Sequence, residues 1–181
     1  MLAVDDHPLI RSAVSEVMRG MAAEVELLEA STPEEGLELL RSRRDTDLVL
    51  LDLKFSRQTG VAFVPRFREL APAVPLVIYT MCEDASLLKA VLAHGVAAIV
   101  PKTHSAKLLR RAIEIVMEGG VYLPPELARQ LASEKAQALS PSMTAQQSRI
   151  LELLAQGMPN KEIARTLGIA SSTVKNQLTI V

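Results

Sequence analysis

The stretch DLVLLDLK, from Asp47 to Lys54, decides the fold that we expect for the first part of the chain. Its apolar residues form a continuous run rather than an alternating one, as is typical of a strand covered on both faces of a parallel sheet. Asp52 follows this run directly. Because an isolated carboxylate is costly at the end of so buried a strand, we expect Asp52 to have charged or metal partners.

Similar short apolar runs recur on both sides of this stretch and are separated by amphipathic segments. The predicted strands are residues 2–4, 25–30, 47–51, 75–80 and 97–100. The predicted helices are residues 8–18, 31–42, 62–70, 84–95 and 105–120. Pro8 stands in the first turn of one helix and Gly95 ends another, which are favourable places for these residues. This alternation predicts an α/β fold with a doubly wound, five-stranded parallel sheet.

The pattern changes after residue 120. We expect a first domain at 1–120, a linker with a short helix at 121–141, and a small all-α domain at 142–181. The last part begins with Thr144 and Gln147, spaced as in a capping box, and contains three short helical patterns. Glycines at 157 and 168 end the first two of these helices. Two domains of different character predict two separate functions.

The composition limits the kinds of protein that this chain can be. The chain of 181 residues is 49% hydrophobic, enough for one ordinary domain and a small second one. Its one cysteine, Cys82, excludes an intramolecular disulfide. The N-terminus lacks the basic region of a signal peptide, and no apolar run approaches the roughly 18 residues of a membrane helix. We therefore expect a soluble cytoplasmic protein that makes no membrane contact.

The net charge of −1 conceals an asymmetry between the two ends of the chain. Residues 1–122 are acidic overall, whereas residues 140–181 hold four Lys/Arg against two Asp/Glu. An excess of this size is, by itself, weak evidence for nucleic-acid binding.

Polar residues stand at the ends of the predicted strands. They are Asp5 and Asp6, Asp52, Thr80 and Lys102. In a doubly wound sheet, the site lies beyond the carboxyl ends of the strands, so these residues should meet there. Carboxylates brought together repel one another unless a hard cation such as Mg²⁺ joins them. With a hydroxyl and an ammonium beside them, this set suits phosphoryl transfer to Asp52.

Each of these signals is ordinary when taken alone. A pair of aspartates after a strand is usually a helix cap or a solvated turn, and a lysine after a strand is usually solvated. The coincidence of all of them at successive strand ends of one sheet is what favours a functional site. His7 is expected at the rim of the site rather than on a metal.

The same residues carry a resemblance to a known family. The segments AVDDHPLIR (3–11), DLVLLDL (47–53), VIYTMCED (77–84) and AIVPK (98–102) resemble the receiver domain of two-component response regulators. The segments NKEIARTLGI (160–169) and STVKNQL (172–178) are similar to a LuxR-type helix-turn-helix. Together they resemble the NarL/FixJ subfamily over nearly the whole chain, with a flavodoxin-like receiver.

The resemblance implies a role for each residue at the strand ends. Asp52 would accept a phosphoryl group from a sensor histidine kinase, and Thr80 and Lys102 would convey the phosphorylation state. Asp5, Asp6, Asp52 and the backbone carbonyl of Lys54 would hold Mg²⁺. The protein would not be an enzyme beyond this transfer and a slow self-dephosphorylation. It would dimerise when phosphorylated and regulate transcription at promoter DNA.

The sequence departs from the family pattern around this site. Phe55-Ser56 replaces the usual Met-Pro, and Thr59 replaces an acidic residue before Gly60. Ile99 occupies the switch position, where many receivers carry an aromatic side chain that swings inward. Pro101 precedes the lysine of the motif instead of following it. We expect the phosphorylation chemistry to be intact and the output switch to differ.

Lys54 suggests a further hypothesis. It lies two residues after Asp52, so its ammonium can reach over the acidic site or slow the attack of water on a phosphoaspartate. The alternative is that the side chain simply points to solvent.

In the tail, the second helix of the helix-turn-helix is expected to enter the major groove. Val174 and Leu178 should face the core of the tail. The opposite face should carry the residues that contact DNA, namely Ser172, Thr173, Lys175, Asn176 and Thr179. The resemblance places Lys175, Asn176 and Thr179 at base-facing positions, where Asn suits adenine and Lys suits guanine or phosphate.

The family carries a fourth helix after the recognition helix, and we expect a tail without it to be poorly packed, mostly monomeric and weak in DNA binding. This expectation keeps a second function open, a phosphorylation-dependent protein-interaction module whose tail no longer binds DNA. A phosphohydrolase with an aspartyl nucleophile is disfavoured, because that class usually has a second Asp where this chain has Lys54.

Overall fold

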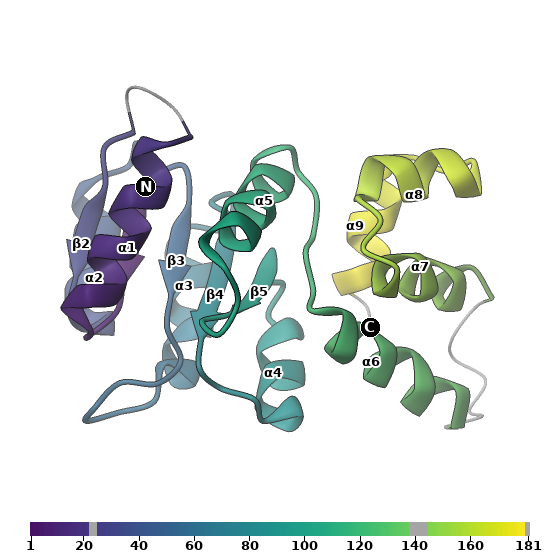
Figure 1. Ribbon diagram of the computed structural model, residues 1–181, viewed down its shortest axis with the longest axis horizontal. Coiled ribbons are helices and arrows are strands. Elements are labelled where there is room, and N and C mark those ends of the chain that lie inside the picture. The colour runs from purple at the N-terminus through teal and green to yellow at the C-terminus, as the bar shows by residue number, and fades with distance from the viewer. Residues whose placement is uncertain (22–24, 138–144, 180–181) are drawn as a thin grey trace.

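The structure is a computed structural model that describes residues 1–21, 25–137 and 145–179. Its first part contains one five-stranded sheet in which all neighbouring strands are parallel, in the order β2-β1-β3-β4-β5 (Figure 1). The strands are β1 (Leu2–Val4), β2 (Leu28–Ala30), β3 (Val49–Leu51), β4 (Leu76–Thr80) and β5 (Ala98–Pro101). This is the strand order of the flavodoxin-like doubly wound fold, as the alternating pattern predicts.

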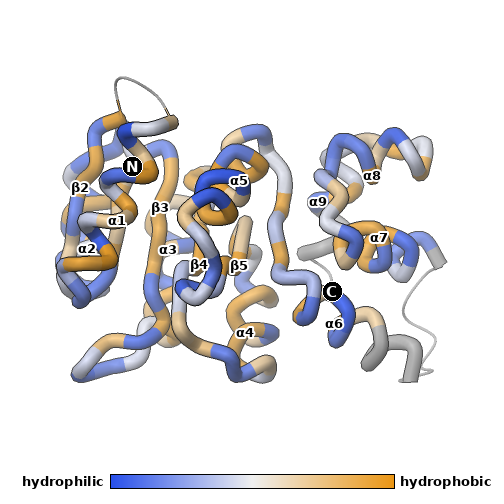
Figure 2. The backbone as a smooth tube through the Cα atoms, in the orientation of Figure 1, coloured by the Kyte–Doolittle hydropathy of each residue, from blue (hydrophilic) through white to orange (hydrophobic). Residues whose placement is uncertain are grey.

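Helices cover both faces of the sheet. On one face lie α1 (Pro8–Arg19) and α5 (Ala106–Met117), packed on Leu50, Val77 and Val100. On the other face lie α2 (Pro33–Ser42), α3 (Val64–Leu70) and α4 (Ala85–Leu92). Alternate residues of each strand point to opposite faces. Leu51 and Ile78 therefore belong to the apolar cluster between the sheet and α2, α3 and α4. Both faces of β3 are therefore buried, and Figure 2 shows β3 as apolar along its length.

Side-chain hydrogen bonds at the N-termini of α2 and α4 fix where these helices begin. The Thr32 hydroxyl accepts a hydrogen bond from the Glu35 N–H at 3.2 Å, and Glu35 Oε2 accepts one from the Ser31 N–H at 2.7 Å. The first bond satisfies an N–H of the first turn of α2, and the second holds Ser31, the residue that precedes the N-cap residue Thr32. At α4, Asp84 Oδ1 accepts from the N–H groups of Ser86 and Leu87 at 2.8 and 3.2 Å.

Several elements differ in extent from the prediction; α4 and α5, for example, end at Leu92 and Met117 rather than at residues 95 and 120. Residues 25–27 lie outside β2, and residues 47 and 48 lie outside β3, so the paired segments are shorter than the apolar runs. The helix predicted at 62–70 begins earlier, as the 3-10 turn η1 (Gly60–Phe63), and then continues as α3. Leu48 is buried although it lies just outside β3, so burial extends beyond the paired residues there, whereas Val25 and Glu26 are exposed and belong to no strand.

The segment after α5 returns to the sheet instead of leading directly away from it. The Ile99 N–H donates to the Tyr122 carbonyl at 3.0 Å, and the Tyr122 N–H donates to the Ala97 carbonyl at 3.1 Å. Tyr122 thereby forms a parallel bridge with Ala98 on the outer edge of β5. Val121, Leu123 and the first turns of α6 (Pro125–Gln137) are buried in the same cluster as α4. The first half of the predicted linker is therefore part of the sheet domain's core.

The last described part of the chain is a small helical unit. It consists of α7 (Ala145–Ala155), α8 (Asn160–Leu167) and α9 (Ser171–Thr179). Val174 of α9 is fully buried with Ile163 and Leu151, as predicted. Leu178 and the predicted capping residue Thr144 lie outside the side chains that the structure describes. Gly168 has a φ of 65° between α8 and α9, a left-handed conformation that favours glycine.

Among the residues that the structure describes, no helix combines the length and the apolar character needed to cross a bilayer.

The buried position of β3 generates the first prediction. Leu51 is 0% exposed, whereas Leu9 of α1 is 84% exposed. Leu51→Ala should lower the free energy of unfolding by about 2–5 kcal/mol, because it leaves a cavity between β3 and α2–α4. Leu9→Ala, the matched control, should change it by no more than about 0.5 kcal/mol. Urea unfolding measures both, and equal effects of the two substitutions would contradict this packing.

Candidate functional site

The polar residues predicted at the strand ends lie together at the carboxyl edge of the sheet. Backbone pairing brings them there, because the Asp52 N–H donates to the Val4 carbonyl and the Lys102 N–H to the Thr80 carbonyl. Asp5, Asp52 and Thr80 are 4%, 2% and 1% exposed. Their burial means that any charge among them must be balanced locally.

Lys102 provides that balance. Its side chain is 2% exposed, and its Nζ lies 2.6 Å from Asp5 Oδ2 and is also hydrogen-bonded to Asp52 Oδ2. One ammonium therefore joins the carboxylates that follow β1 and β3. The second oxygen of Asp52, Oδ1, accepts hydrogen bonds from the N–H groups of Leu53 at 2.6 Å and Lys54 at 3.0 Å. Asp52 is thus held on both oxygens.

Asp6 lies beside Asp5 and Asp52, and Ser56 rather than Lys102 holds its carboxylate. Its Oδ2 accepts hydrogen bonds from both the N–H and the hydroxyl of Ser56, the first at 2.7 Å. Burial alone raises the pKa of Asp6, but the bonds from Ser56 and the charge of His7 bring that pKa below its ordinary value. Asp6 therefore stays ionised at neutral pH.

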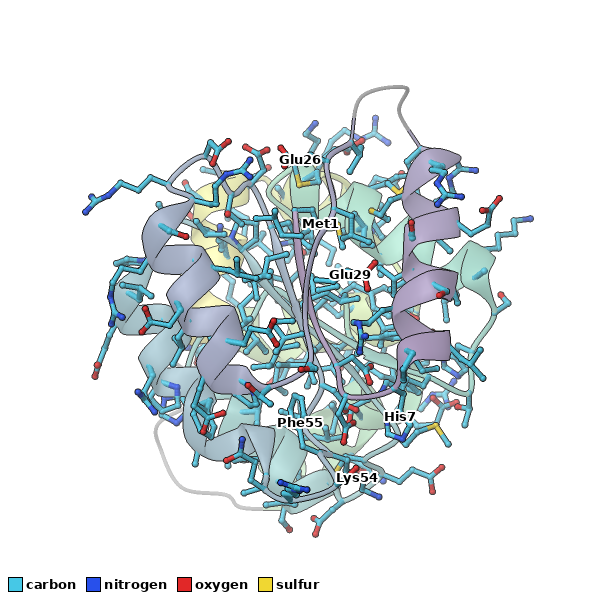
Figure 3. The ribbon with its side chains drawn as sticks, turned by 90° about the vertical axis from the view of Figure 1, so that its left-hand side faces the viewer. Met1, His7, Glu26, Glu29, Lys54 and Phe55 are labelled. Atoms are coloured by element: carbon cyan, nitrogen blue, oxygen red, sulfur yellow. The ribbon has the colours of Figure 1, made fainter. Side chains whose placement is uncertain are left out.

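His7 is at the rim of the site, as predicted. Its side chain is 60% exposed, and its Nδ1 lies 3.2 Å from Asp5 Oδ1 and 2.9 Å from Asp6 Oδ1. Figure 3 shows His7, Lys54 and Phe55 toward one edge of the molecule, away from Met1 and Glu26. The site thus opens to solvent on the side where His7 and the loop after β3 lie.

The donor set fits a divalent cation. Asp5, Asp6, His7 and Asp52 each offer one ligand atom, and these atoms lie within 4.8 Å of one another. Asp6 Oδ1 is buried and has no hydrogen-bond partner in the described part of the chain, since its contact with His7 lacks hydrogen-bond geometry. Carboxylate oxygens are the ligands that Mg²⁺ prefers. The acidic cluster therefore fits a site for Mg²⁺.

The remaining predicted residues of this site have defined positions. The Thr80 hydroxyl oxygen accepts a hydrogen bond from the Cys82 N–H at 3.2 Å, which leaves its own hydrogen available to a ligand. Lys54 is exposed, and its backbone is fixed beside Asp52 by the N–H bond to Oδ1. Ile99, the predicted switch position, is 1% exposed in β5 and is bonded through its N–H to Tyr122.

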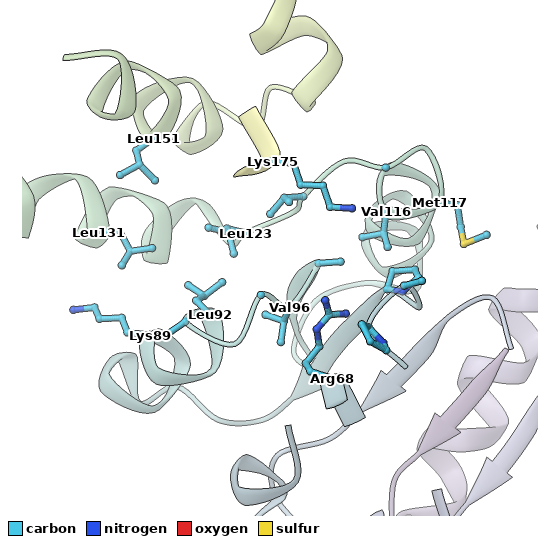
Figure 4. A pocket seen from close by; sticks show the side chains of 18 of the residues that line it. Arg68, Lys89, Leu92, Val96, Val116, Met117, Leu123, Leu131, Leu151 and Lys175 are labelled. Carbon is cyan, nitrogen blue, oxygen red and sulfur yellow. The ribbon is translucent and has the colours of Figure 1, made fainter. Parts of the chain in front are cut away.

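The predicted DNA-contacting residues are far from this edge, on α9. Ser172 and Lys175 are exposed and Thr173 is half-buried, while the side chains of Asn176 and Thr179 lie outside the described part. Lys175 lines a cavity of about 490 Å³ between the tail and the sheet domain, together with Val116 and Met117 of α5 (Figure 4). This predicted base-facing residue therefore points toward the sheet domain in this structure.

Two features of the site escape sequence reasoning. Ser56 stands out in the sequence only as a departure from the family pattern, yet it donates two hydrogen bonds to Asp6. Arg11 carries no signal in the sequence, yet its Nη1 donates to the Asp5 carbonyl at 2.7 Å and its Nε to Glu29 at 2.9 Å. Serines on loops and arginines on helices are common in any sequence. Only the three-dimensional positions of Ser56 and Arg11 show that they contact the site.

Comparison with known proteins agrees with this geometry. A family model described as "Response regulator receiver domain" matches residues 1–114. A second one, described as "Bacterial regulatory proteins, luxR family", matches residues 141–180. The two matches cover the sheet domain and the helical tail.

Curated relatives match the chain along nearly its whole length. It is 30% identical to a "Glycerol metabolism activator" of Pseudomonas putida over 191 residues, covering 100% of this chain and 86% of the relative. It is 32% identical to the "Nitrate/nitrite response regulator protein NarL" of Escherichia coli K12 over 182 residues, covering 97% and 83%.

Solved structures share the fold. The RcsB response regulator of Salmonella typhimurium superposes with a TM-score of 0.66 at 22% identity, covering 97% of this chain and 86% of that one. A LuxR family DNA-binding response regulator from Silicibacter pomeroyi gives a TM-score of 0.60 at 26% identity, covering 68% and 94%.

The buried charges generate the second prediction. Lys102→Met should lower the free energy of unfolding by about 3–5 kcal/mol, because Asp5 and Asp52 then repel each other without a cation between them. Millimolar Mg²⁺ should restore much of this loss, since a cation bound to the folded site stabilises it. Lys107→Met, at an exposed position of α5, is the control. Urea unfolding with and without Mg²⁺ checks this, and a loss that Mg²⁺ leaves unchanged would contradict it.

Proposed function

Since the chain belongs to the NarL-type response regulators, which join a receiver domain to a LuxR-type DNA-binding domain, we propose that Asp52 is its phosphoacceptor and that phosphorylation of Asp52 controls DNA binding by the tail. The observation that supports this most is the buried set of Asp5, Asp52 and Lys102 at the carboxyl edge of the sheet. We further propose that residues 1–120 form the receiver, 121–141 the linker and 142–181 the DNA-binding domain. Such a protein acts in the cytoplasm.

The proposed reaction is a transfer from a phosphohistidine of a sensor kinase. A carboxylate oxygen of Asp52 attacks phosphorus, the P–N bond to the imidazole breaks, and an acyl phosphate forms on Asp52. Lys102, already beside Asp52, pairs with the charge of the transferred group. The Thr80 hydroxyl donates a hydrogen bond to a phosphoryl oxygen. The chain is otherwise not an enzyme, apart from slow hydrolysis of its own phosphoaspartate.

Mg²⁺ would be held by Asp5, Asp6, Asp52 and the Lys54 carbonyl. When bound, it would offset the negative charge of the phosphoryl group. Asp6 Oδ1, which is buried and has no hydrogen-bond partner in the described chain, supports this assignment.

The place of the tail supports a mechanism for regulation. Lys161 of α8 lies 3.7 Å from Glu118, directly after α5, and Lys175 of α9 lines the cavity beside α5. A recognition helix must be free to enter the major groove. We propose that the arrangement seen here is the resting state and that phosphorylation releases α9. Ser172, Thr173, Lys175, Asn176 and Thr179 then contact promoter DNA, with two phosphorylated copies pairing on it. The RcsB response regulator, which shares this fold, has been solved as a complex with DNA.

The coupling from site to tail should run through β5. Ile99 is buried and is joined by its N–H to Tyr122, whose neighbours Val121 and Leu123 lead into α6. Because Ile99 has no ring to swing inward, a movement of the β5 edge passed to the linker replaces the usual switch in this proposal.

The third prediction tests the proposed phosphoacceptor. The Asp52→Asn variant should accept no phosphoryl group when it is incubated with acetyl phosphate and Mg²⁺. In a gel shift with a pool of random DNA duplexes, acetyl phosphate should not raise the affinity of this variant for DNA. The wild type should bind more DNA after phosphorylation. Asp45→Asn, at an exposed site outside the cluster, should behave as wild type. Phosphorylation of the wild type without any gain in DNA binding would favour an interaction module instead.

The fourth prediction concerns Lys54, whose exposed side chain follows Asp52 by two residues. If its ammonium shields the phosphoaspartate from water, Lys54→Ala should shorten the lifetime of the phosphorylated protein several-fold. Decay of the phosphorylated form on a phosphate-affinity gel measures this lifetime. Arg57→Ala, at an exposed position of the same loop, is the control, and unchanged lifetimes in both would show that Lys54 points to solvent.

A further inference from the structure

Ser56 joins the loop after β3 to the loop after β1, which lies 50 residues earlier in the chain. Its N–H donates to Asp6 Oδ2 at 2.7 Å, and its hydroxyl donates to the same oxygen. We infer that Ser56 is a positioning residue, which holds the Asp6 carboxylate in the orientation that binds the divalent cation. This inference rests on the proposed function, because it concerns the same metal site.

The two oxygens of Asp6 have different surroundings, and this difference carries the inference. Oδ2 accepts both bonds from Ser56. Oδ1 is buried, has no hydrogen-bond partner among the described residues, and belongs to the cluster whose ligand atoms lie within 4.8 Å of one another. With Oδ2 fixed, the carboxylate cannot rotate freely, so less ordering remains for the cation to impose on Oδ1.

The loop that carries Ser56 is itself held in place. The Phe55 N–H donates to the Gln58 carbonyl at 3.2 Å, and the Gly60 N–H donates to the Leu53 carbonyl at 2.9 Å. A Cβ at Gly60 would lie 2.2 Å from the Asp52 carbonyl oxygen, so only glycine lets the loop close so tightly. Gln58 Nε2 donates to Glu34 of α2 at 2.8 Å. Ser56 thus reaches Asp6 from a loop anchored on both sides.

The residue type matters because serine supplies two donors from one position. Alanine keeps the N–H and loses the hydroxyl, proline loses both, and threonine keeps both. Phe55-Ser56 therefore gives Asp6 two donors at a position where a proline would offer neither.

The test is the affinity for Mg²⁺, measured by calorimetry on the full chain in the absence of any phosphodonor. Ser56→Ala should weaken Mg²⁺ binding roughly 10-fold, at the low end for hydrogen-bond partners of metal ligands because Ser56 is exposed. Ser56→Pro should weaken it further, and Ser56→Thr should restore it. Gln58→Ala, which removes the bond from the same loop to α2, is the control and should leave the affinity near that of the wild type.

The outcomes separate this inference from the proposed function. If the wild type binds Mg²⁺ and Ser56→Ala and Ser56→Pro bind it equally well, Ser56 does not position Asp6, while the proposed function stands. If Gln58→Ala weakens binding as much as Ser56→Ala does, the effect is one of loop order, and the inference is also wrong. If the wild type neither binds Mg²⁺ nor accepts a phosphoryl group, the proposed function fails and this inference fails with it.

Discussion

The ammonium of Lys102, buried between Asp5 and Asp52, is the interaction on which the rest of this structure depends. Parallel pairing in the order β2-β1-β3-β4-β5 puts the ends of β1 and β3 next to each other, so two carboxylates must share one buried edge. Such a pair is tolerable only with a cation between or beside the two groups. Lys102, delivered by β5, supplies one, and the same edge can accept a second, divalent one.

This arrangement makes the site responsive to charge. A phosphoryl group on Asp52, as proposed, would add negative charge and would draw on the same ammonium that now joins Asp52 to Asp5. A change in that pairing would act where β4 and β5 end, because the N–H of Lys102, directly after β5, donates to the carbonyl of Thr80, the last residue of β4. From β5 the linker continues the sheet edge through Tyr122. In the proposed mechanism, the phosphorylation site and the linker to the tail would thus both act through β5.

Much of the fold followed from periodicity, because continuous apolar runs and amphipathic stretches report burial directly. The positions of Asp52, Thr80 and Lys102 followed from the rule that strand ends meet at one edge. The partners of Asp6 did not, since the reach of Ser56 depends on how the loop after β3 closes around Gly60. Nor did the return of the linker to β5, because residues 121–123 read as a connector until their backbone bonds are known. The sequence also did not predict that the polar face of α9 lies toward the sheet domain, since a polar helix face does not specify what it contacts.

The central claim is that Asp52 carries the phosphoryl group. The most direct measurement is to phosphorylate the protein with acetyl phosphate and Mg²⁺, reduce the acyl phosphate with borohydride, and map the peptides by mass spectrometry. Homoserine should then replace Asp52 and no other acidic residue, and omitting Mg²⁺ should remove the signal. Reduction at Asp5 or Asp6, or an unmodified Asp52 in a phosphorylated protein, would contradict it.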